Sequence, residues 1–361
     1  MHLLGLEHAV IHRRQALKLL GLGLLSLNTV GISRSWASMT GLTPAEAREL
    51  VKGSRVMMGN IPVTISVAAS GRRDQATKAI AAAFEEIQRL EGLLSLYNSA
   101  SEVSRINRAA GQRPTSVSFE TWEVISRGLE FGRLTNGAFS PVLGAASQRW
   151  SFLDKKHVLT PAEVAELKPE SHLEDLVLDE NRQTVWLRKP GMKVDLGGIA
   201  KGYIAERAKA VLLEHGVTSG IVATAGDLVI FGAKPDGKPW RVGVQHPRKP
   251  GYTMASMELT DCAISTSGDY ERFFTEDGVI YHHILDPETL FPARECQSVT
   301  VVADHGLFAD ALSTGAFVMG SERGMALLHR TGLGKTIIID GRGGVSVSPE
   351  LESRVRFGDE S

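Results

Sequence analysis

Ten residues near the middle of the chain decide the fold: Val194-Asp195-Leu196-Gly197-Gly198-Ile199-Ala200-Lys201-Gly202-Tyr203. An acidic residue ends a predicted strand, a glycine pair turns the chain, and a helix begins. The amino end of a helix presents free N–H groups and the positive end of its dipole, which suit a phosphate. Lys201 adds a positive charge there, and Asp195 can accept hydrogen bonds from a polar ring or a ribose. The stretch also fits a purely structural turn with a surface lysine, since it is neither a GxGxxG motif nor a Walker loop.

The flanking segments predict helices and strands that do not alternate strictly. Helices are expected over residues 74–96, 119–134, 200–215 and 308–319, where apolar residues recur at helical spacing. Strands are expected over residues 57–69, 185–187, 193–195, 221–231, 241–244, 262–266, 279–285, 298–303 and 336–340. This order favours a mixed α+β fold over a doubly wound sheet. Since no Pro/Ser-rich linker divides residues 38–361, they are predicted to form one domain.

The composition excludes some classes of function. With 43% hydrophobic and 22% charged residues, the 361-residue chain can build a hydrophobic core. Its 40 Lys and Arg balance 41 Asp and Glu, which argues against a nucleic-acid partner. Cys262 and Cys296 belong to no CxxC or zinc-type pattern. They either pair as a disulfide in an exported protein or act as two small buried hydrophobic residues.

Residues 1–37 predict a cleavable signal peptide. Arg13-Arg14 precede an apolar run that ends near Ile32, and Ser35-Trp36-Ala37 offers small residues for cleavage. The run is short and weakly apolar for a membrane-spanning helix. The arginine pair resembles a twin-arginine signal, with an ordinary secretory signal or a retained membrane anchor as alternatives. We therefore expect a periplasmic protein, membrane-anchored only if the signal is not removed.

A second motif, Ala309-Asp310-Ala311-Leu312-Ser313-Thr314-Gly315, offers metal ligands. Asp310 and Thr314 are four residues apart and so share one face of a helix. A carboxylate and a hydroxyl are hard oxygen ligands, which suit Mg²⁺ or Ca²⁺ but do not select zinc. The alternative is that Asp310 caps the helix and Thr314 bonds a backbone carbonyl.

Two further groups of residues are weaker candidates. Residues 264–270 form a Ser/Thr-Gly loop with donors for phosphate oxygens, and residues 281–287 place His283 at a strand end. His283 is either a proton shuttle or a structural residue bonded to Asp286. Tyr97 and the turn 136–141 fit a flat ring or the core equally well, and residues 223–227 form another small-residue turn.

In this order, the motifs resemble the FAD:protein FMN transferase family, the ApbE type, over about residues 55–330. The matching stretches are Met58-Gly59, Ser95-Leu96-Tyr97-Asn98, Ser101-Glu102-Val103-Ser104, Gly137-Ala138-Phe139, residues 195–203, Thr266-Ser267-Gly268-Asp269-Tyr270, His283-Ile284-Leu285-Asp286-Pro287 and residues 309–314. The stretches around Lys201 and Asp310 are the most specific.

The resemblance implies roles for individual residues. The Gly198 carbonyl, Asp310 and Thr314 would bind the metal, Mg²⁺ or alternatively Ca²⁺, and His283 and Lys201 would act in catalysis. The residues implied to contact FAD are Met58, Tyr97, Ala138, Phe139, Ser140, Asp195, Lys201 and Ile284.

The implied reaction moves the FMN half of FAD to a Ser or Thr hydroxyl of a client protein and releases AMP. The client would be an exported or membrane-bound flavoprotein of electron transport. A hydrolase that splits FAD into FMN and AMP, and a non-catalytic FAD-binding protein, are the alternatives.

Three positions depart from the family pattern. Ser140 stands where Asp is common, Ala225-Gly226-Asp227 replaces Gly-Gly-Asp, and Leu290 replaces the Gly of Asp-Pro-x-Thr-Gly. These changes affect the expected FAD affinity and choice of client more than the metal ligands, and Leu290 predicts a rebuilt loop.

Overall fold

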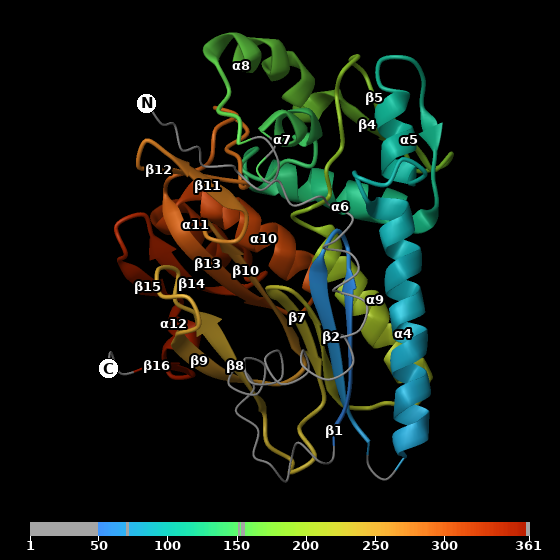
Figure 1. Ribbon diagram of the computed structural model, residues 1–361, viewed down its shortest axis with the longest axis vertical. Helices are drawn as coiled ribbons and strands as arrows, with labels where there is room; N and C mark the ends of the chain where they lie inside the picture. The colour runs from blue at the N-terminus through green and yellow to red at the C-terminus, as the bar shows by residue number, and fades with distance from the viewer. Residues whose placement is uncertain (1–49, 70–71, 151, 153–155, 359–361) are drawn as a thin grey trace, which may run out of the picture.

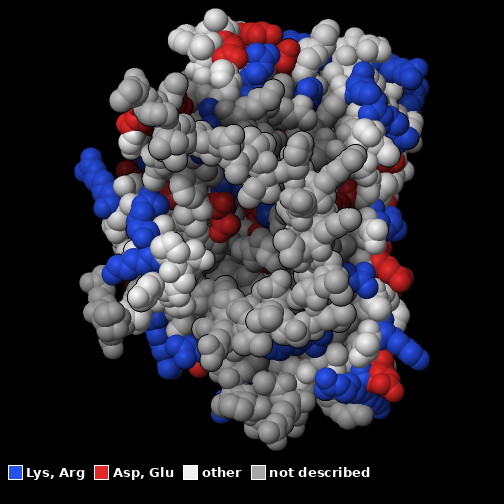
Figure 2. Space-filling model, viewed as in Figure 1, with Lys and Arg blue, Asp and Glu red and all other residues white. Residues whose placement is uncertain are grey.

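The computed structural model describes residues 50–69, 72–150, 152 and 156–358. The predicted signal peptide, residues 1–37, lies outside these ranges. Among the described residues, no helix combines the length and apolar character needed to cross a bilayer. Figure 2 shows basic and acidic side chains interspersed around the edge of the visible face.

An eight-stranded sheet forms the centre of the molecule (Figure 1). Every pair of neighbouring strands in it is antiparallel. Its strands, in spatial order, are β1 (Leu50–Met57), β2 (Ile61–Ala68), β6 (Gly220–Thr224), β7 (Asp227–Phe231), β10 (Cys262–Gly268), β13 (Cys296–Ala303), β14 (Lys335–Asp340) and β15 (Val345–Val347). The fold is therefore α+β, as the sequence predicts, and it is not doubly wound.

Each face of this sheet buries a separate apolar core, because successive strand residues point to opposite faces. One face packs on helices α4 (Arg73–Leu94), α9 (Ala200–Glu214) and α10 (Gly306–Met319), with α6 (Phe119–Leu134) behind α10. The other face packs on a small sheet of β16 (Val355–Phe357), β9 (Thr253–Leu259) and β8 (Trp240–Gln245), centred on the fully buried Trp240. The helices expected from sequence are confirmed to within two residues at each end.

The remaining elements surround the sheet. A third core around Trp150 and Leu290 lies in the upper part of Figure 1. The elements outside the central sheet and its two packed layers are α5 (Glu102–Arg108), α7 (Gly144–Trp150), α8 (Pro161–Leu167), η1 (Lys168–Ser171), η2 (Leu173–Asp175), the strands β3 (Thr115–Ser116), β5 (Thr184–Leu187) and β4 (Leu176–Asp179), the hairpin β11 (Phe273–Glu276) and β12 (Val279–His282), α11 (Ser321–Thr331) and α12 (Pro349–Glu352).

Two of the strands predicted from sequence are hairpins. The strand expected over 57–69 is divided by a turn in which Met58, Gly59 and Asn60 have φ of 48°, 72° and 82°. Met58 therefore lies in the turn between β1 and β2, not on a strand. The strand expected over 221–231 is divided at Ala225, whose φ is 59°. Gly59-Asn60 and Gly226 are turn-forming residues, but the predicted strands run through them because apolar and β-branched residues flank them on both sides.

The strand expected over 193–195 is wrong. A side chain takes the place of the neighbouring strand there: Val194 N donates to Asn107 Oδ1 at 2.7 Å, and Asn107 Nδ2 donates to Val194 O at 3.0 Å. The strand expected over 279–285 is also too long, because β12 ends at His282. His283 thus follows the strand directly.

The two cysteines are not paired. Ala263 lies opposite Ala303 in the β10–β13 ladder, so Cys262 lies at one end of β13 and Cys296 at the other. Seven residues of strand separate these ends, which corresponds to roughly 23 Å. Burial raises the pKa of the Cys262 thiol to about 11 and that of Cys296 to about 12. Both are reduced, weakly reactive thiols, and the disulfide alternative is wrong.

Two glycines let α9 press directly on α10. A Cβ at Gly202 would lie 2.0 Å from the carbonyl oxygen of Gly306, and one at Gly306 would lie 2.4 Å from that of Gly202. Real Cβ atoms do not approach backbone so closely, so both positions require glycine. This contact places Lys201, at the start of α9, beside Asp310 on α10.

Gly202→Ala should therefore destabilise the fold by about 1–3 kcal/mol, because the added methyl group overpacks a helix–backbone contact. Gly92→Ala is the matched control, since Gly92 lies in α4 with open space around its Cβ position. The control should gain about 0.5–1 kcal/mol from the higher helix propensity of alanine. Chemical denaturation measures both, and equal stability of the two variants would contradict the close contact.

Candidate active site

The candidate site lies at one end of the central sheet, where two hairpin turns and the end of β10 meet. Ala225 N donates to Pro62 O at 3.3 Å, which joins the turn that contains Met58 to the turn between β6 and β7. Thr266 N donates to Gly226 O at 3.2 Å, which joins that turn to β10. The first turn of α9 and the middle of α10 complete the site.

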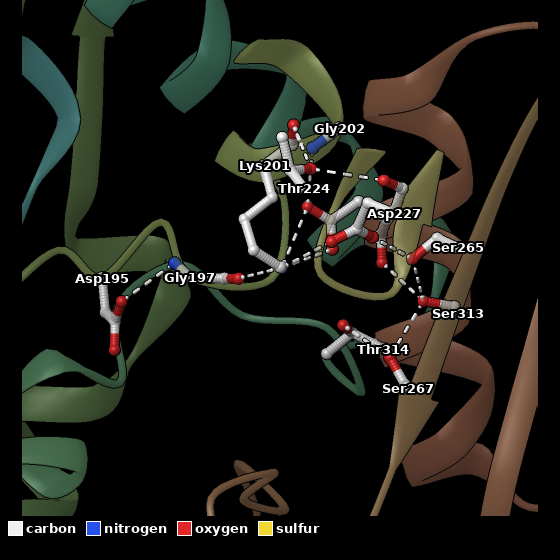
Figure 3. Close-up of polar contacts among 11 residues, drawn as sticks. Asp195, Gly197, Lys201, Gly202, Thr224, Asp227, Ser265, Ser267, Ser313 and Thr314 are labelled. Atoms are coloured by element: carbon white, nitrogen blue, oxygen red, sulfur yellow. Dashed lines mark hydrogen bonds and ion pairs between the residues drawn. The ribbon is translucent and has the colours of Figure 1, made fainter. Parts of the chain in front are cut away.

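The Lys201 side chain connects these elements (Figure 3). Its ammonium donates to Gly197 O at 2.8 Å and to Asp310 Oδ1 at 3.2 Å. It also lies 3.3 Å from Asp227 Oδ2. The Oδ2 atom of Asp310 accepts a further hydrogen bond from Gly202 N at 3.1 Å. Asp310 lies inside α10, and His305 occupies the cap position, so the alternative that Asp310 caps the helix is wrong.

Two carboxylates and one ammonium make this cluster electrostatically asymmetric. Asp227 and Asp310 are only 4% and 2% exposed. Burial, and then the nearby charge of Asp227, raise the pKa of Asp310 to about 7 although Lys201 opposes the shift. Burial alone would lower the pKa of Lys201, but the two carboxylates outweigh it and raise the pKa. With all three groups ionised the cluster carries one excess negative charge, which favours a cation.

Gly198 and Thr314 face each other beside this cluster. A Cβ at Gly198 would lie 3.1 Å from Thr314 Oγ1. No group of three or more His, Cys, Asp or Glu side chains gathers in the described residues. A divalent cation here would therefore need hydroxyl, carbonyl and phosphate oxygens beside Asp310. That donor set, with the excess negative charge, fits Mg²⁺ or Ca²⁺.

Asp195 is held next to this cluster. Its Oδ1 accepts from Gly197 N at 2.9 Å, and its own N donates to Pro141 O at 2.9 Å. The second bond places the turn that contains Ala138 and Ser140 beside Asp195. Tyr97 is 73% exposed, and its hydroxyl interacts with Arg272 and the charge of Asp195. Tyr97, Asp195 and this turn thus lie near one another, and their contact with FAD stays a prediction.

His283 is oriented by its backbone and leaves a ring nitrogen unbonded. Its N donates to Arg272 O at 3.1 Å, and its Nδ1 is buried without a partner, so the alternative bond to Asp286 is absent. Burial, followed by the positive charge of Arg272, holds the pKa of His283 well below its usual range, and Lys201 acts in the same direction. The imidazole is therefore neutral.

Two predicted FAD-contacting residues lie in the core. Phe139 is 3% exposed and packs under the Gly198 turn, where a Cβ would lie 3.4 Å from its ring. Ile284 is 6% exposed, and its N donates to His282 Nδ1 at 3.3 Å. Both support the site from behind, and an FAD contact from either remains a prediction.

Two of the three departures from the family pattern stand at left-handed backbone positions. Ala225 and Leu290 have φ of 59° and 60°, the left-handed region that favours glycine. Each non-glycine residue there costs about 1–2 kcal/mol. Leu290 is fully buried in the third core, and its carbonyl accepts from Trp150 Nε1 at 2.8 Å, which offsets that cost. The loop after His283 therefore still turns sharply, although its glycine is lost.

Sequence reasoning gave no individual role to several residues of the site. Asp227, Ser265, Ser267, Ser313 and Asn107 all bond directly within the site or hold one of its segments. Ser265 and Ser267 were expected in a loop at 264–270, but they lie on strand β10. Asp227 had a signal, since an acidic residue follows a small-residue turn at 223–227. Asn107 had none, because it lies 87 residues from its partner Val194.

Together, the fold and the site define a mixed α+β protein with a buried ammonium–carboxylate cluster at one end of its sheet. The sequence model of the ApbE family matches residues 58–337, and the chain belongs to this family.

Relatives and solved structures agree with this assignment. The FAD:protein FMN transferase of Treponema pallidum is 36% identical over 268 residues, covering 69% of this chain and 74% of the relative. The FAD:protein FMN transferase of Klebsiella pneumoniae is 32% identical over 280 residues, covering 76% of this chain and 85% of the relative. The ApbE protein of Thermotoga maritima superposes with a TM-score of 0.78 at 33% identity, covering 85% of this chain and 99% of the other. The flavin transferase ApbE of Vibrio cholerae superposes with a TM-score of 0.75 at 29% identity, also covering 85% of this chain and 99% of the other.

The buried His282 beside the site predicts acid sensitivity. Its Nε2 bonds Ala293 O at 2.8 Å, and burial lowers its pKa to about 4. In the unfolded chain this histidine binds a proton near pH 6.5. The part of the folding free energy that depends on neutral His282 is therefore fully present above pH 6.5 and is lost as the pH falls to about 4. The loss should be about 3 kcal/mol.

Guanidinium unfolding at pH 7 and pH 4.5 measures this loss. His282→Gln should flatten the pH dependence, whereas His329→Gln, whose side chain is 74% exposed, should retain it. An unchanged slope in His282→Gln would disprove the assignment.

Proposed function

We propose that this chain transfers the FMN moiety of FAD to a Ser or Thr hydroxyl of a client flavoprotein and releases AMP. The observation that carries the proposal is the buried Lys201–Asp227–Asp310 cluster beside the unbonded Nδ1 of a neutral His283. Membership of the ApbE family, whose listed relatives are named FAD:protein FMN transferase, supports the choice of substrate.

The reaction requires one new bond and one broken bond at a single phosphorus. The client oxygen forms a bond to the flavin-side phosphorus, and the bond from that phosphorus to the bridging oxygen breaks. The bridging oxygen leaves with its electron pair as part of AMP. Negative charge grows on the phosphate oxygens, so a buried ammonium such as Lys201 stabilises the transition state.

His283 is the base in this proposal. A general base must reach the proton that it removes and must be deprotonated at the working pH. The lowered pKa of His283 and its unbonded Nδ1 meet the second requirement. His283 takes the proton of the client hydroxyl as that oxygen attacks phosphorus.

Gly198 O, Asp310 and Thr314 would hold Mg²⁺, with Ca²⁺ as the alternative ion. When bound, the ion supplies positive charge to the phosphate oxygens. The FAD contacts that we propose come from the hairpin turn at Met58, from Tyr97, from Asp195 and Lys201, and from the turn of Ala138, Phe139 and Ser140, with Ile284 behind it. Hydroxyl and carboxylate groups among them suit the ribityl chain and ring edge of a flavin.

Incubation of the protein with Mg²⁺, FAD and a client fragment tests the reaction class. Covalent flavin on the client, detected by mass spectrometry, is the expected result. Free FMN without labelled client would identify a hydrolase instead, and intact FAD that stays bound would identify a non-catalytic binding protein.

In the same assay, His283→Ala should transfer FMN about 10²–10⁴-fold more slowly, because the general base is lost. Its FAD affinity should stay close to that of the unmodified protein. His329→Ala, which removes an exposed histidine, is the matched control and should transfer normally. Full transfer by His283→Ala would eliminate this histidine as the base.

We also propose that residues 1–37 direct export by the twin-arginine route, so that the enzyme serves an exported or membrane-bound electron-transport flavoprotein in the periplasm. Replacing Arg13 and Arg14 together by lysine should retain the protein in the cytoplasm, because this route depends on the arginine pair. Arg34→Lys, outside the pair, should leave export unchanged. Cell fractionation measures both, and a periplasmic double variant would refute the route.

A further inference from the structure

A chain of hydroxyl groups, buried at Ser265 and Ser313 and half-buried at Ser267 and Thr314, runs through the site from Asp227 (Figure 3). Ser265 Oγ lies 3.1 Å from Ser313 Oγ, Ser313 Oγ lies 2.9 Å from Ser267 Oγ, and Ser267 Oγ lies 3.3 Å from Thr314 Oγ1. Ser265 and Ser313 are 2% and 0% exposed. None of these three serines contacts a phosphate or a cation in the function proposed above, so the row of hydrogen-bonded hydroxyl groups needs its own explanation.

The hydrogen bonds of this hydroxyl chain have only one possible donor-to-acceptor direction at the Asp227 end. Ser265 Oγ donates its single proton to the carboxylate Oδ1 of Asp227. A hydroxyl group has one proton and two lone pairs. Ser265 can therefore only accept in its contact with Ser313, and it cannot donate a proton to it.

Ser313 fixes the direction of the remaining bonds. Besides Ser265, it contacts the backbone carbonyl of Asp310 at 3.0 Å, which is also only an acceptor. Its single proton is thus committed to these two oxygens. Ser267 must then donate to Ser313, and Thr314 must donate to Ser267.

This direction decides what Thr314 offers to the site. Its proton is used in the bond to Ser267, so the Thr314 hydroxyl keeps its oxygen lone pairs for another partner. A hydroxyl group that binds a cation uses these lone pairs and donates its proton elsewhere. Polar partners behind a metal ligand commonly orient it in this way.

We propose that Ser313 and Ser267 are positioning residues, which turn the Thr314 hydroxyl into a cation ligand under the control of the Asp227 carboxylate. The inference rests on the proposed cation site at Gly198, Asp310 and Thr314. Asp227 thus has two roles: it shares the Lys201 ammonium with Asp310 and it draws the hydroxyl protons away from the cation.

Removal of either serine should weaken the cation site for different reasons. In Ser313→Ala, the Ser267 proton loses its acceptor and can bond Thr314 Oγ1, which occupies a ligand lone pair. In Ser267→Ala, the Thr314 proton loses its acceptor and its orientation. Each change should weaken Mn²⁺ binding about tenfold, as is typical of groups behind a metal ligand.

The experiment measures the dissociation constant of Mn²⁺ by the electron paramagnetic resonance of the free ion, with FAD saturating and no client present. The double variant Ser313→Ala/Ser267→Ala should bind Mn²⁺ no more weakly than the weaker single variant, because both changes break one chain. Thr266→Val is the matched control. Thr266 lies between the two β10 serines but bonds Thr300 at 2.9 Å on the other side of the sheet.

The outcomes separate this inference from the proposed function. Wild-type affinity in both single variants, or fully additive losses in the double variant, would overturn the hydroxyl chain while the cation site stands. Absence of Mn²⁺ binding by the unmodified protein would overturn the cation site itself. Melting temperatures verify folding, and if Ser313→Ala fails to fold, the loss in Ser267→Ala against Thr266→Val decides the question.

Discussion

The buried ammonium of Lys201 is the interaction on which the rest of the site depends. It joins the glycine turn before α9, the Asp227 end of β7 and the Asp310 face of α10. Removing one partner from a buried cluster of charges leaves another uncompensated, which is strongly destabilising. The two carboxylates exceed the one ammonium, so the fold itself creates the demand for a further positive charge.

The backbone makes this cluster possible. The mutual contact of Gly202 and Gly306 brings α9 against α10, and the side chain of Asn107 holds the segment before the turn. Phe139 packs beneath Gly198 from the opposite side. Apolar packing thus fixes the positions of the polar groups of the site, and a small change in helix spacing would separate Lys201 from Asp310.

The site also combines charge with directed hydroxyl groups. Asp227 contacts both the ammonium and Ser265, so one buried carboxylate connects the electrostatics of Lys201 to the orientation of Thr314. His283 remains outside this network with a free ring nitrogen. An acceptor left unbonded in an otherwise satisfied site is costly, and such costs are concentrated where a residue must remain available for chemistry.

The sequence by itself determined the class of fold, the four principal helices, the family and the placement of Asp310 and Thr314 on one face of a helix, because helical periodicity and local motifs are encoded within a few residues. It indicated the turn at residues 223–227 but did not determine the hairpin turn at Met58, the separation of Cys262 from Cys296, or the role of Asn107. Only the tertiary structure decided that Asp227 of β7, Ser265 and Ser267 of β10, and Ser313 of α10 form one network. Hydrogen bonds between residues 38 to 48 positions apart leave no local pattern, since they arise only when the sheet and α10 pack together.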